Sequence, residues 1–261
     1  MPAAVVKNVR GVFCDIDDTL TSEGKLTARA YAALERLRSG GRLVVPITGR
    51  PAGWCDHIAR MWPVDAVVGE NGAFYFYYDA AQKKLAQRFL FDAAARAANR
   101  QKMIAVRERI LREVPGCALA SDQRYREADL AIDFCEDVPR LPFAEVDRIA
   151  ALMRAAGMTA KISSVHVNGW FGDYDKLGMT RTLMQERYGI DLALDQAGYL
   201  FVGDSPNDAP MFGFFSNSVG VANVADFGAR LSDAPAYVTS RRSGEGFVEV
   251  AERLLQANHG A

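Results

Sequence analysis

The stretch VRGVFCDIDDTLT, residues 9–21, decides the fold expected for this chain. Its first part is a short, nearly continuous apolar run that ends at Cys14, as expected of a strand covered on both faces. Three carboxylates follow it: Asp15, Asp17 and Asp18. Like charges this close repel each other, and burial makes their ionised forms still less favourable. A fold that keeps them together therefore needs something that offsets this repulsion.

Strands and helices alternate in the residues that follow this stretch. Thr27 is a candidate cap for a helix with one apolar face, which the pair Gly40-Gly41 would end. Residues 43–47 form a second buried-type strand, Pro51 suits the first turn of another helix, and residues 66–68 make a third strand. This alternation predicts an α/β fold with a Rossmann-like parallel sheet.

The pattern changes in the middle third of the chain. It predicts a hairpin around residues 79–83, then helices and extended segments over 93–114, 128–134, 143–156 and 159–167. The strand–helix alternation then returns, with a strand over 199–202 and a helix over 224–231. We therefore expect residues 82–171 to form an α+β unit inserted into an α/β domain made of residues 1–81 and 172–261.

The composition excludes several classes of partner. Lys and Arg total 31 and Asp and Glu total 32, so the net charge is −1 and no basic field attracts nucleic acid or an anionic membrane. No segment has the apolar length of a signal peptide or a membrane span. The four cysteines are scattered and include no CxxC, which indicates reduced thiols in a cytoplasmic protein. The sequence does not indicate an oligomeric state.

Polar residues follow three of the predicted strands at the point where each strand ends. They are Asp15-x-Asp17, Thr48-Gly49-Arg50 and the run GDSPND at residues 203–208. Ligands of open α/β sheets bind beyond the carboxyl ends of the strands. Lys176, in DYDKLG, stands at the start of a predicted helix. Two carboxylate clusters, a hydroxyl group and a lysine are therefore expected to converge on one edge of the sheet.

These motifs resemble those of the haloacid dehalogenase (HAD) superfamily of phosphohydrolases. DIDDT matches DxDxT, and the Thr of PITGR, the Lys of DKLG and GDSPND for GDxxND follow in the same order. The insertion lies between the second and third motifs, which resembles the Cof-like and sucrose-phosphatase-like subclass with a large α/β cap. GENGA, residues 69–73, also resembles that subclass. The resemblance implies a phosphoric monoester hydrolase acting on small phosphorylated metabolites, such as sugar phosphates or phosphoglycolate-like acids.

The carboxylates suit a metal-dependent phosphotransfer site. Mg²⁺ prefers hard oxygen ligands, and a cation among Asp15, Asp204 and Asp208 would turn their mutual repulsion into attraction. Asp15 is then placed as the nucleophile that forms an aspartyl-phosphate. The resemblance implies that the backbone carbonyl of Asp17 also binds the metal. The Asp17 side chain would protonate the leaving oxygen and then activate water.

The remaining motif residues would hold the phosphoryl group. Thr48 and the backbone N–H groups that follow it, at Gly49 and Arg50, would bind its oxygens. Lys176 would neutralise charge on Asp15 and on the phosphoryl group. Asn207 would orient a ligand or Lys176.

Simpler interpretations stand beside several of these assignments. Thr48 could cap the following helix, Lys176 could be an exposed helix residue, and Asp208 could be a first-turn carboxylate favoured by the helix dipole. Arg50 could bind substrate phosphate or form a local salt bridge. Asp18 stands where many relatives carry Gly, and the sequence assigns it no role.

The insertion is expected to act as a lid over the site, since closure excludes water and adds contacts to the leaving group. Arg124 and His166 are candidate substrate contacts in it, although a structural role is the simpler interpretation for both. Two other functions remain open. A phosphomutase would share the aspartyl-phosphate step, and a receiver-like signalling module would use a similar Asp, Thr and Lys set without an inserted lid.

Overall fold

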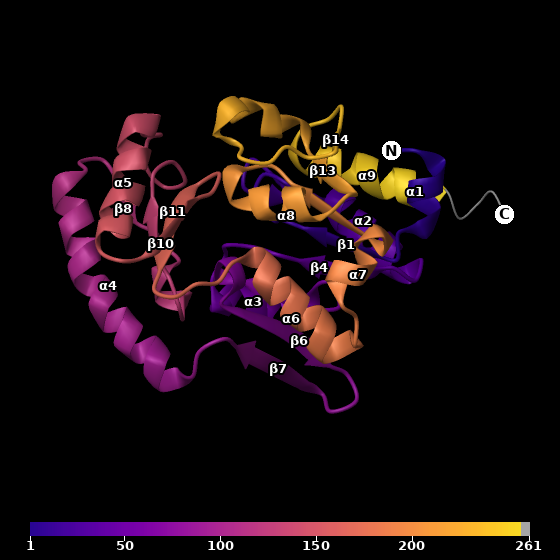
Figure 1. The fold of residues 1–261 in the computed structure, drawn as a ribbon, viewed down its shortest axis with the longest axis horizontal. Helices are drawn as coiled ribbons and strands as arrows, with labels where there is room; N and C mark the ends of the chain where they lie inside the picture. The colour runs from indigo at the N-terminus through magenta and orange to yellow at the C-terminus, as the bar shows by residue number, and fades with distance from the viewer. Residues whose placement is uncertain (257–261) are drawn as a thin grey trace.

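The computed structural model describes residues 1–256, in which a parallel sheet flanked by helices lies beside a second, smaller unit (Figure 1). The main sheet has five parallel strands. In spatial order they are β14 (Tyr237–Val238), β13 (Ser218–Gly220), β12 (Tyr199–Gly203), β1 (Gly11–Cys14) and β4 (Leu43–Pro46). The predicted α/β fold with a parallel sheet is confirmed.

Strand β1 lies inside this sheet, and its residues are buried on both faces. Val12 and Cys14 pack on one face and Phe13 packs on the other, as the two-residue period of a strand requires. The pairing with β12 and β4 continues past the strand, because Asp15 N donates to Val202 O and Ile47 N donates to Cys14 O. The aspartates therefore begin at the carboxyl edge of the sheet.

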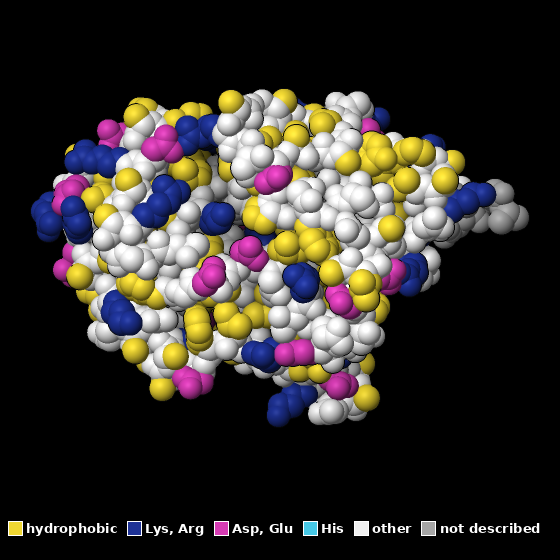
Figure 2. All heavy atoms as spheres, in the orientation of Figure 1, with side chains coloured by type: hydrophobic (Ala, Val, Ile, Leu, Met, Phe, Trp, Pro, Cys, Tyr) yellow, Lys and Arg dark blue, Asp and Glu magenta, His cyan; other side chains and the backbone are white. Residues whose placement is uncertain are grey.

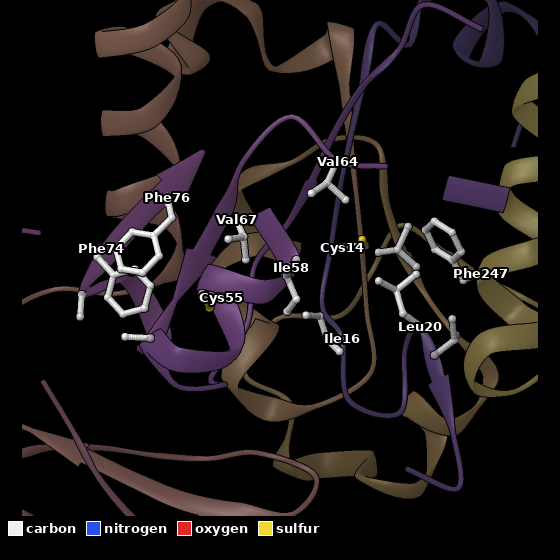
Figure 3. Close-up of a cluster of buried hydrophobic side chains, with 14 of the residues drawn as sticks. Cys14, Ile16, Leu20, Cys55, Ile58, Val64, Val67, Phe74, Phe76 and Phe247 are labelled. Atoms are coloured by element: carbon white, nitrogen blue, oxygen red, sulfur yellow. The ribbon is translucent and has the colours of Figure 1, made fainter. Parts of the chain in front are cut away.

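Helices cover both faces of the sheet. The face of Val12 packs against α2 (Ala28–Ser39), α3 (Ala52–Met61) and α9 (Ser243–Gln256), and Figure 3 shows the apolar side chains that fill this layer. The face of Phe13 packs against α6 (Lys176–Tyr188) and α8 (Ala209–Phe214). Two shorter helices are α1 (Ala3–Asn8) and α7 (Leu192–Asp195).

Two small antiparallel sheets adjoin the main one. A three-stranded sheet consists of β5 (Val67–Gly69), β6 (Phe74–Asp79) and β7 (Lys84–Phe89), and a bridge from Val68 to Ile47 links it to the end of β4. A short hairpin of β2 (Thr21–Ser22) and β3 (Lys25–Leu26) follows the aspartates. Both sheets border the edge where the polar residues gather.

The second unit is an antiparallel sheet with two helices, which Figure 1 shows beside the carboxyl edge of the main sheet. Its strands lie in the order β10 (Thr159–Ile162), β11 (His166–Trp170), β9 (Leu130–Asp133) and β8 (Ala118–Leu119). Its helices are α4 (Ala93–Glu113) and α5 (Phe143–Ala155). We call this unit the cap. The predicted boundary near residue 82 falls in the turn between β6 and β7, and the one near 171 follows β11; the division into domains stays a prediction.

Most of the local predictions agree with the structure. The Thr27 hydroxyl caps α2 by accepting from Ala30 N, and Gly40 ends that helix. Two segments differ. The extended segment 159–167 is two antiparallel strands, β10 and β11, joined by a turn. The 3₁₀ turns Ala222–Asp226 and Gly228–Arg230 replace a helix expected after residue 224.

Charged side chains of both signs are interspersed on the face in Figure 2, with several Lys and Arg side chains along the edge formed by α4. This distribution agrees with the net charge of −1. Within residues 1–256, no helix combines the length and apolar character needed to cross a bilayer.

Candidate active site

Three carboxylates and one lysine meet at the carboxyl edge of the main sheet. Asp15 follows β1, Asp204 follows β12, and Asp208 ends the 3₁₀ turn Pro206–Asp208. One oxygen from each carboxylate lies within 4.8 Å of the others, and all three residues are buried. Lys176 Nζ lies 2.7 Å from Asp208 Oδ1 and 3.1 Å from Asp15 Oδ1. Residues up to 193 positions apart in the sequence therefore converge, as the motifs predict.

The charges in this cluster are not balanced. Burial raises the pKa of Asp15 to about 7 although Lys176 opposes the change. Burial also raises the pKa of Asp204 well above its ordinary range, and the charges of Asp208 and Asp15 add to the effect. The raised pKa values of both residues mean that the cluster lacks the positive charge needed to keep every carboxylate ionised.

Backbone geometry fixes the position of Lys176. The lysine is the first residue of α6, and the helix is capped by Asp175, whose Oδ1 accepts from Gly178 N. Gly72 has a φ of 109°, and a Cβ there would lie 2.0 Å from the Asp175 carbonyl oxygen, so only glycine permits this approach. Lys176 is 2% exposed, which rules out the interpretation of it as an exposed helix residue.

Asp208 is held by the backbone as well as by Lys176. Its Oδ2 accepts from the backbone N of Asp204 at 3.0 Å and of Ser205 at 3.3 Å. Asn207 lies beside it, where its Oδ1 accepts from the Ser205 hydroxyl and its Nδ2 donates to Asn71 Oδ1 at 3.4 Å. Thus Asn207 is tied to the turn and to Asn71.

Thr48 and Gly49 form a second wall of the site. The Thr48 hydroxyl is buried and accepts from Arg50 N at 3.0 Å, so it caps a turn. It does not cap α3, whose N-cap residue is Pro51. A Cβ on Gly49 would lie 3.1 Å from Asn71 Nδ2, and this buried amide nitrogen has no hydrogen-bond partner among the described residues. A donor is therefore free beside Gly49.

The Asp17 side chain belongs to a second charged cluster. Arg50 Nη2 lies 2.7 Å from Asp17 Oδ1, and Arg50 Nε donates to both oxygens of Asp17. The same guanidinium reaches two cap residues, Asp122 at 3.3 Å and Glu136 at 2.5 Å. Arg50 thus binds one carboxylate of the main domain and two of the cap.

His166 belongs to this second cluster. Its Nε2 lies 2.8 Å from Glu136 Oε2, and its side chain is buried. Burial alone would raise the pKa of Glu136, but the hydrogen bonds from His166 and Arg50 lower it to about 2. Arg124 lies elsewhere, in an open hollow on the cap with Arg100 and Arg107. Of the two predicted cap contacts, only His166 lies near Asp17.

Two further contacts join the cap to the main domain. Arg126 Nη1 donates to Gly49 O at 2.8 Å and pairs with Asp122 and Asp129. The Glu70 carboxylate accepts from the backbone N of Ala52 in α3 and from the backbone N of two cap residues, 127 and 128. These contacts join the cap to the main domain at the carboxyl edge of the sheet.

Comparison with known proteins shows what this chain is similar to. A family model described as haloacid dehalogenase-like hydrolase matches residues 12–100. The chain is similar to this family over that segment. A phosphoglycolate phosphatase of Methanospirillum hungatei is 27% identical over 245 residues, which cover 93% of this chain and 95% of that protein. The resemblance that the motifs indicate is confirmed.

Several solved structures share the fold of this chain. A protein of Thermoplasma acidophilum has a TM-score of 0.68 at 20% identity, covering 94% of this chain and 98% of its own. The sucrose-phosphatase of Synechocystis sp. PCC6803, solved in complex with sucrose and phosphate, has a TM-score of 0.63 at 16% identity, covering 95% and 98%.

Sequence reasoning missed several residues that complete the site. The Thr19 hydroxyl donates to Asp204 Oδ1 at 3.1 Å, and Asn223 Nδ2 donates to Asp204 Oδ2 and to the Asp18 carbonyl. Thr19 is the threonine of DIDDT and could have been predicted from that motif. Glu136 and Asn223 carry no local signal in the sequence. Asp18 has a φ of 55°, a conformation that favours glycine, which agrees with the Gly of many relatives.

Proposed function

We propose that this protein is a Mg²⁺-dependent phosphatase that hydrolyses small phosphomonoesters through an aspartyl-phosphate on Asp15. The proposal rests chiefly on the buried cluster of Asp15, Asp204 and Asp208, which one lysine leaves short of positive charge. The match to the family model supports a hydrolase, and the curated relative named a phosphoglycolate phosphatase supports phosphate esters as substrates. A cytoplasmic location stays a prediction.

The cluster fits a hard divalent cation. It offers only carboxylate oxygens, and Asp15 Oδ1 is buried without a hydrogen-bond donor apart from its ion pair with Lys176. When bound, Mg²⁺ would neutralise the charge that collects on these carboxylates and on the phosphoryl oxygens. Asp15 and Asp204 are the side-chain ligands we propose, with Asp208 as a third and the carbonyl of Asp17 as a fourth.

In the first step Asp15 forms a bond to phosphorus while the bond from phosphorus to the leaving oxygen breaks. Asp17 gives its proton to that oxygen, which departs as an alcohol. In the second step Asp17 takes a proton from water, the water oxygen bonds to phosphorus, and Asp15 is released as a carboxylate. Both transfers require Asp17 to exchange part of its contact with Arg50 for the reacting group.

The remaining side chains position and stabilise the phosphoryl group. Lys176 lies against Asp15 and carries a pKa above its ordinary value, because the charges of Asp15 and Asp208 outweigh burial. It can therefore remain charged beside the negative charge of the transferring group. The free Nδ2 of Asn71, next to Gly49, is a further donor for a phosphoryl oxygen. Thr48 holds the turn that presents these groups.

The cap would act as the lid of this site. Its Asp122 and Glu136 contact Arg50, and its backbone at residues 127 and 128 contacts Glu70. A lid that meets Arg50, itself bound to Asp17, encloses the leaving group and excludes water from the aspartyl-phosphate.

The test is phosphate release from a panel of sugar phosphates and phosphoglycolate, with Mg²⁺ and with EDTA. We expect turnover only with the metal, and Asp15→Asn should lower kcat by at least about 1,000-fold, because the nucleophile is lost. Asp56→Asn, an exposed change on α3, is the matched control and should have wild-type turnover. Unchanged turnover in Asp15→Asn would contradict the assignment. A requirement for a sugar bisphosphate, with phosphate returned to sugar, would support a phosphomutase instead.

A further inference from the structure

A cavity of about 410 Å³ lies between α3, the β2–β3 hairpin and the cap. Cavities of roughly 300 Å³ or more can enclose most of a small organic ligand. Five of the lining side chains are apolar or aromatic, and they come from the hairpin, from α3 and the residue after it, and from the residue after Asp15: Ile16, Leu26, Trp54, Ile58 and Trp62. The cavity can therefore hold an apolar body much larger than two carbon atoms.

One end of this cavity is polar and adjoins the reaction site. Asp17, Arg50 and Glu136 all line it. Asp17 is the residue that we propose to protonate the leaving oxygen, so that oxygen must lie within hydrogen-bond reach of it. The rest of the leaving alcohol then extends away from phosphorus on the Asp17 side, where the cavity begins.

We propose that this cavity is the subsite for the leaving alcohol and that it takes an uncharged alcohol with an apolar, ring-sized body. The inference rests on the proposed phosphatase function and adds a substrate class to it. Trp54 provides one wall: it is 42% exposed and lies with its ring 4.4 Å from the Arg50 guanidinium carbon. An aromatic side chain left open in this way offers a flat apolar surface to a ring.

The charges at the polar end disfavour an acidic leaving group. A carboxylate placed in the cavity would face Asp17 and Glu136. Arg50 is the only Lys or Arg among the described residues that line the cavity, and Asp17, Asp122 and Glu136 already contact its guanidinium. A second acid would therefore add like charge beside Asp17 and Glu136 without gaining a free Lys or Arg; His57 also lines the cavity. This feature separates the present site from one built for a glycolate-like acid.

The test compares three phosphate esters of primary alcohols: benzyl phosphate, 4-carboxybenzyl phosphate and 2-phosphoglycolate. The wild-type protein with Mg²⁺ should show its highest kcat/KM with benzyl phosphate and a value at least about 10-fold lower with 4-carboxybenzyl phosphate. Trp54→Ala should raise KM for benzyl phosphate about 5- to 10-fold and change that for 2-phosphoglycolate less than about 2-fold. Trp54→Phe keeps an aromatic ring, so its KM for benzyl phosphate should lie close to the wild-type value. Met61→Ala, which removes an exposed side chain on the same helix outside the cavity, is the matched control.

The outcomes distinguish this inference from the proposed function. If Trp54→Ala lowers kcat/KM equally for all three esters, Trp54 acts only through Arg50 and the subsite is wrong. If 2-phosphoglycolate or 4-carboxybenzyl phosphate is the best substrate, the assigned substrate class is wrong while the phosphatase function stands. If no phosphate ester is hydrolysed at all, the proposed function itself fails.

Discussion

The two charged clusters of this molecule solve the problem of buried carboxylates in opposite ways. In the first, Asp204 contacts Thr19 and Asn223, and within residues 1–256 no Lys or Arg forms an ion pair with it. In the second, Glu136 contacts Arg50 and His166. Burial raises the pKa of Asp204 well above its ordinary range, whereas the contacts of Glu136 overcome burial and lower its pKa to about 2.

This difference separates a cluster that is short of positive charge from one that contains its own guanidinium group. A cluster whose carboxylates already meet guanidinium groups gains little from a further cation. A cluster that buries three carboxylates beside one lysine is costly until a cation arrives, because ionised groups removed from water need a partner. The chain supplies cations to the Arg50 cluster from its own residues and leaves the Asp15 cluster short of positive charge.

The largest effect on stability is expected at Lys176. Lys176→Met removes the only lysine of the Asp15 cluster and should lower the free energy of unfolding at pH 7 in EDTA by about 3–5 kcal/mol. Mg²⁺ should recover a large part of that loss, because a bound cation replaces the missing charge. Urea unfolding with and without Mg²⁺ measures both values. Lys84→Met, an exposed change in β7, should have no such effect. An equal loss with and without Mg²⁺ would contradict the replacement of the lysine charge by a bound cation.

Arg50 provides the opposite test in the second cluster. Arg50→Met leaves Asp17, Asp122 and Glu136 without their shared cation and should cost about 3 kcal/mol, since removing one partner of a buried ion pair strands the other. Mg²⁺ should not restore this loss, in contrast to Lys176→Met. Arg60→Met, an exposed change on α3, is the control and should stay near wild type. Recovery of Arg50→Met by Mg²⁺ would mean that the two clusters are not separate.

The smallest effect is expected at Glu136, whose contribution to the free energy of unfolding should depend on pH. Its folded-state pKa of about 2 lies below its ordinary value, so its contribution is present above pH about 4.5 and is lost as the pH falls toward 2. Glu136→Gln should therefore lower the free energy of unfolding by about 2 kcal/mol at pH 7 and by progressively less below pH about 4.5. Urea unfolding at several pH values, with the exposed Glu108→Gln as control, measures the difference. A stability difference between wild type and variant that grows as the pH falls would contradict the lowered pKa of Glu136.

The motifs predicted the Asp15 cluster because each of its members follows a strand or begins a helix. The apolar run before Asp15 indicates a buried strand, and parallel strands bring their carboxyl ends to one edge. The contact of Thr19 with Asp204 could also have been predicted, since Thr19 lies in the same motif as Asp15. In each case the local pattern specifies the position of the side chain before any long-range contact is known.

The Arg50 cluster could not be predicted in the same way. Arg50 and Glu136 are 86 positions apart, and Glu136 belongs to no motif. Their contact depends on how the cap packs against the main domain, which is decided by the burial of both surfaces. The Arg50–Trp54 contact is local, but the cavity beside it also needs the β2–β3 hairpin and the cap.

The sequence by itself therefore determined the α/β fold, the family and the edge of the sheet where its acidic motifs meet. Strand periodicity and motif order carry that information locally. Only the tertiary structure decided that Asp17 pairs with Arg50, that the cap shares this arginine, and that an apolar cavity opens beside Asp17. These features arise where separate surfaces pack together, and shape and charge at such a contact belong to no single segment of the chain.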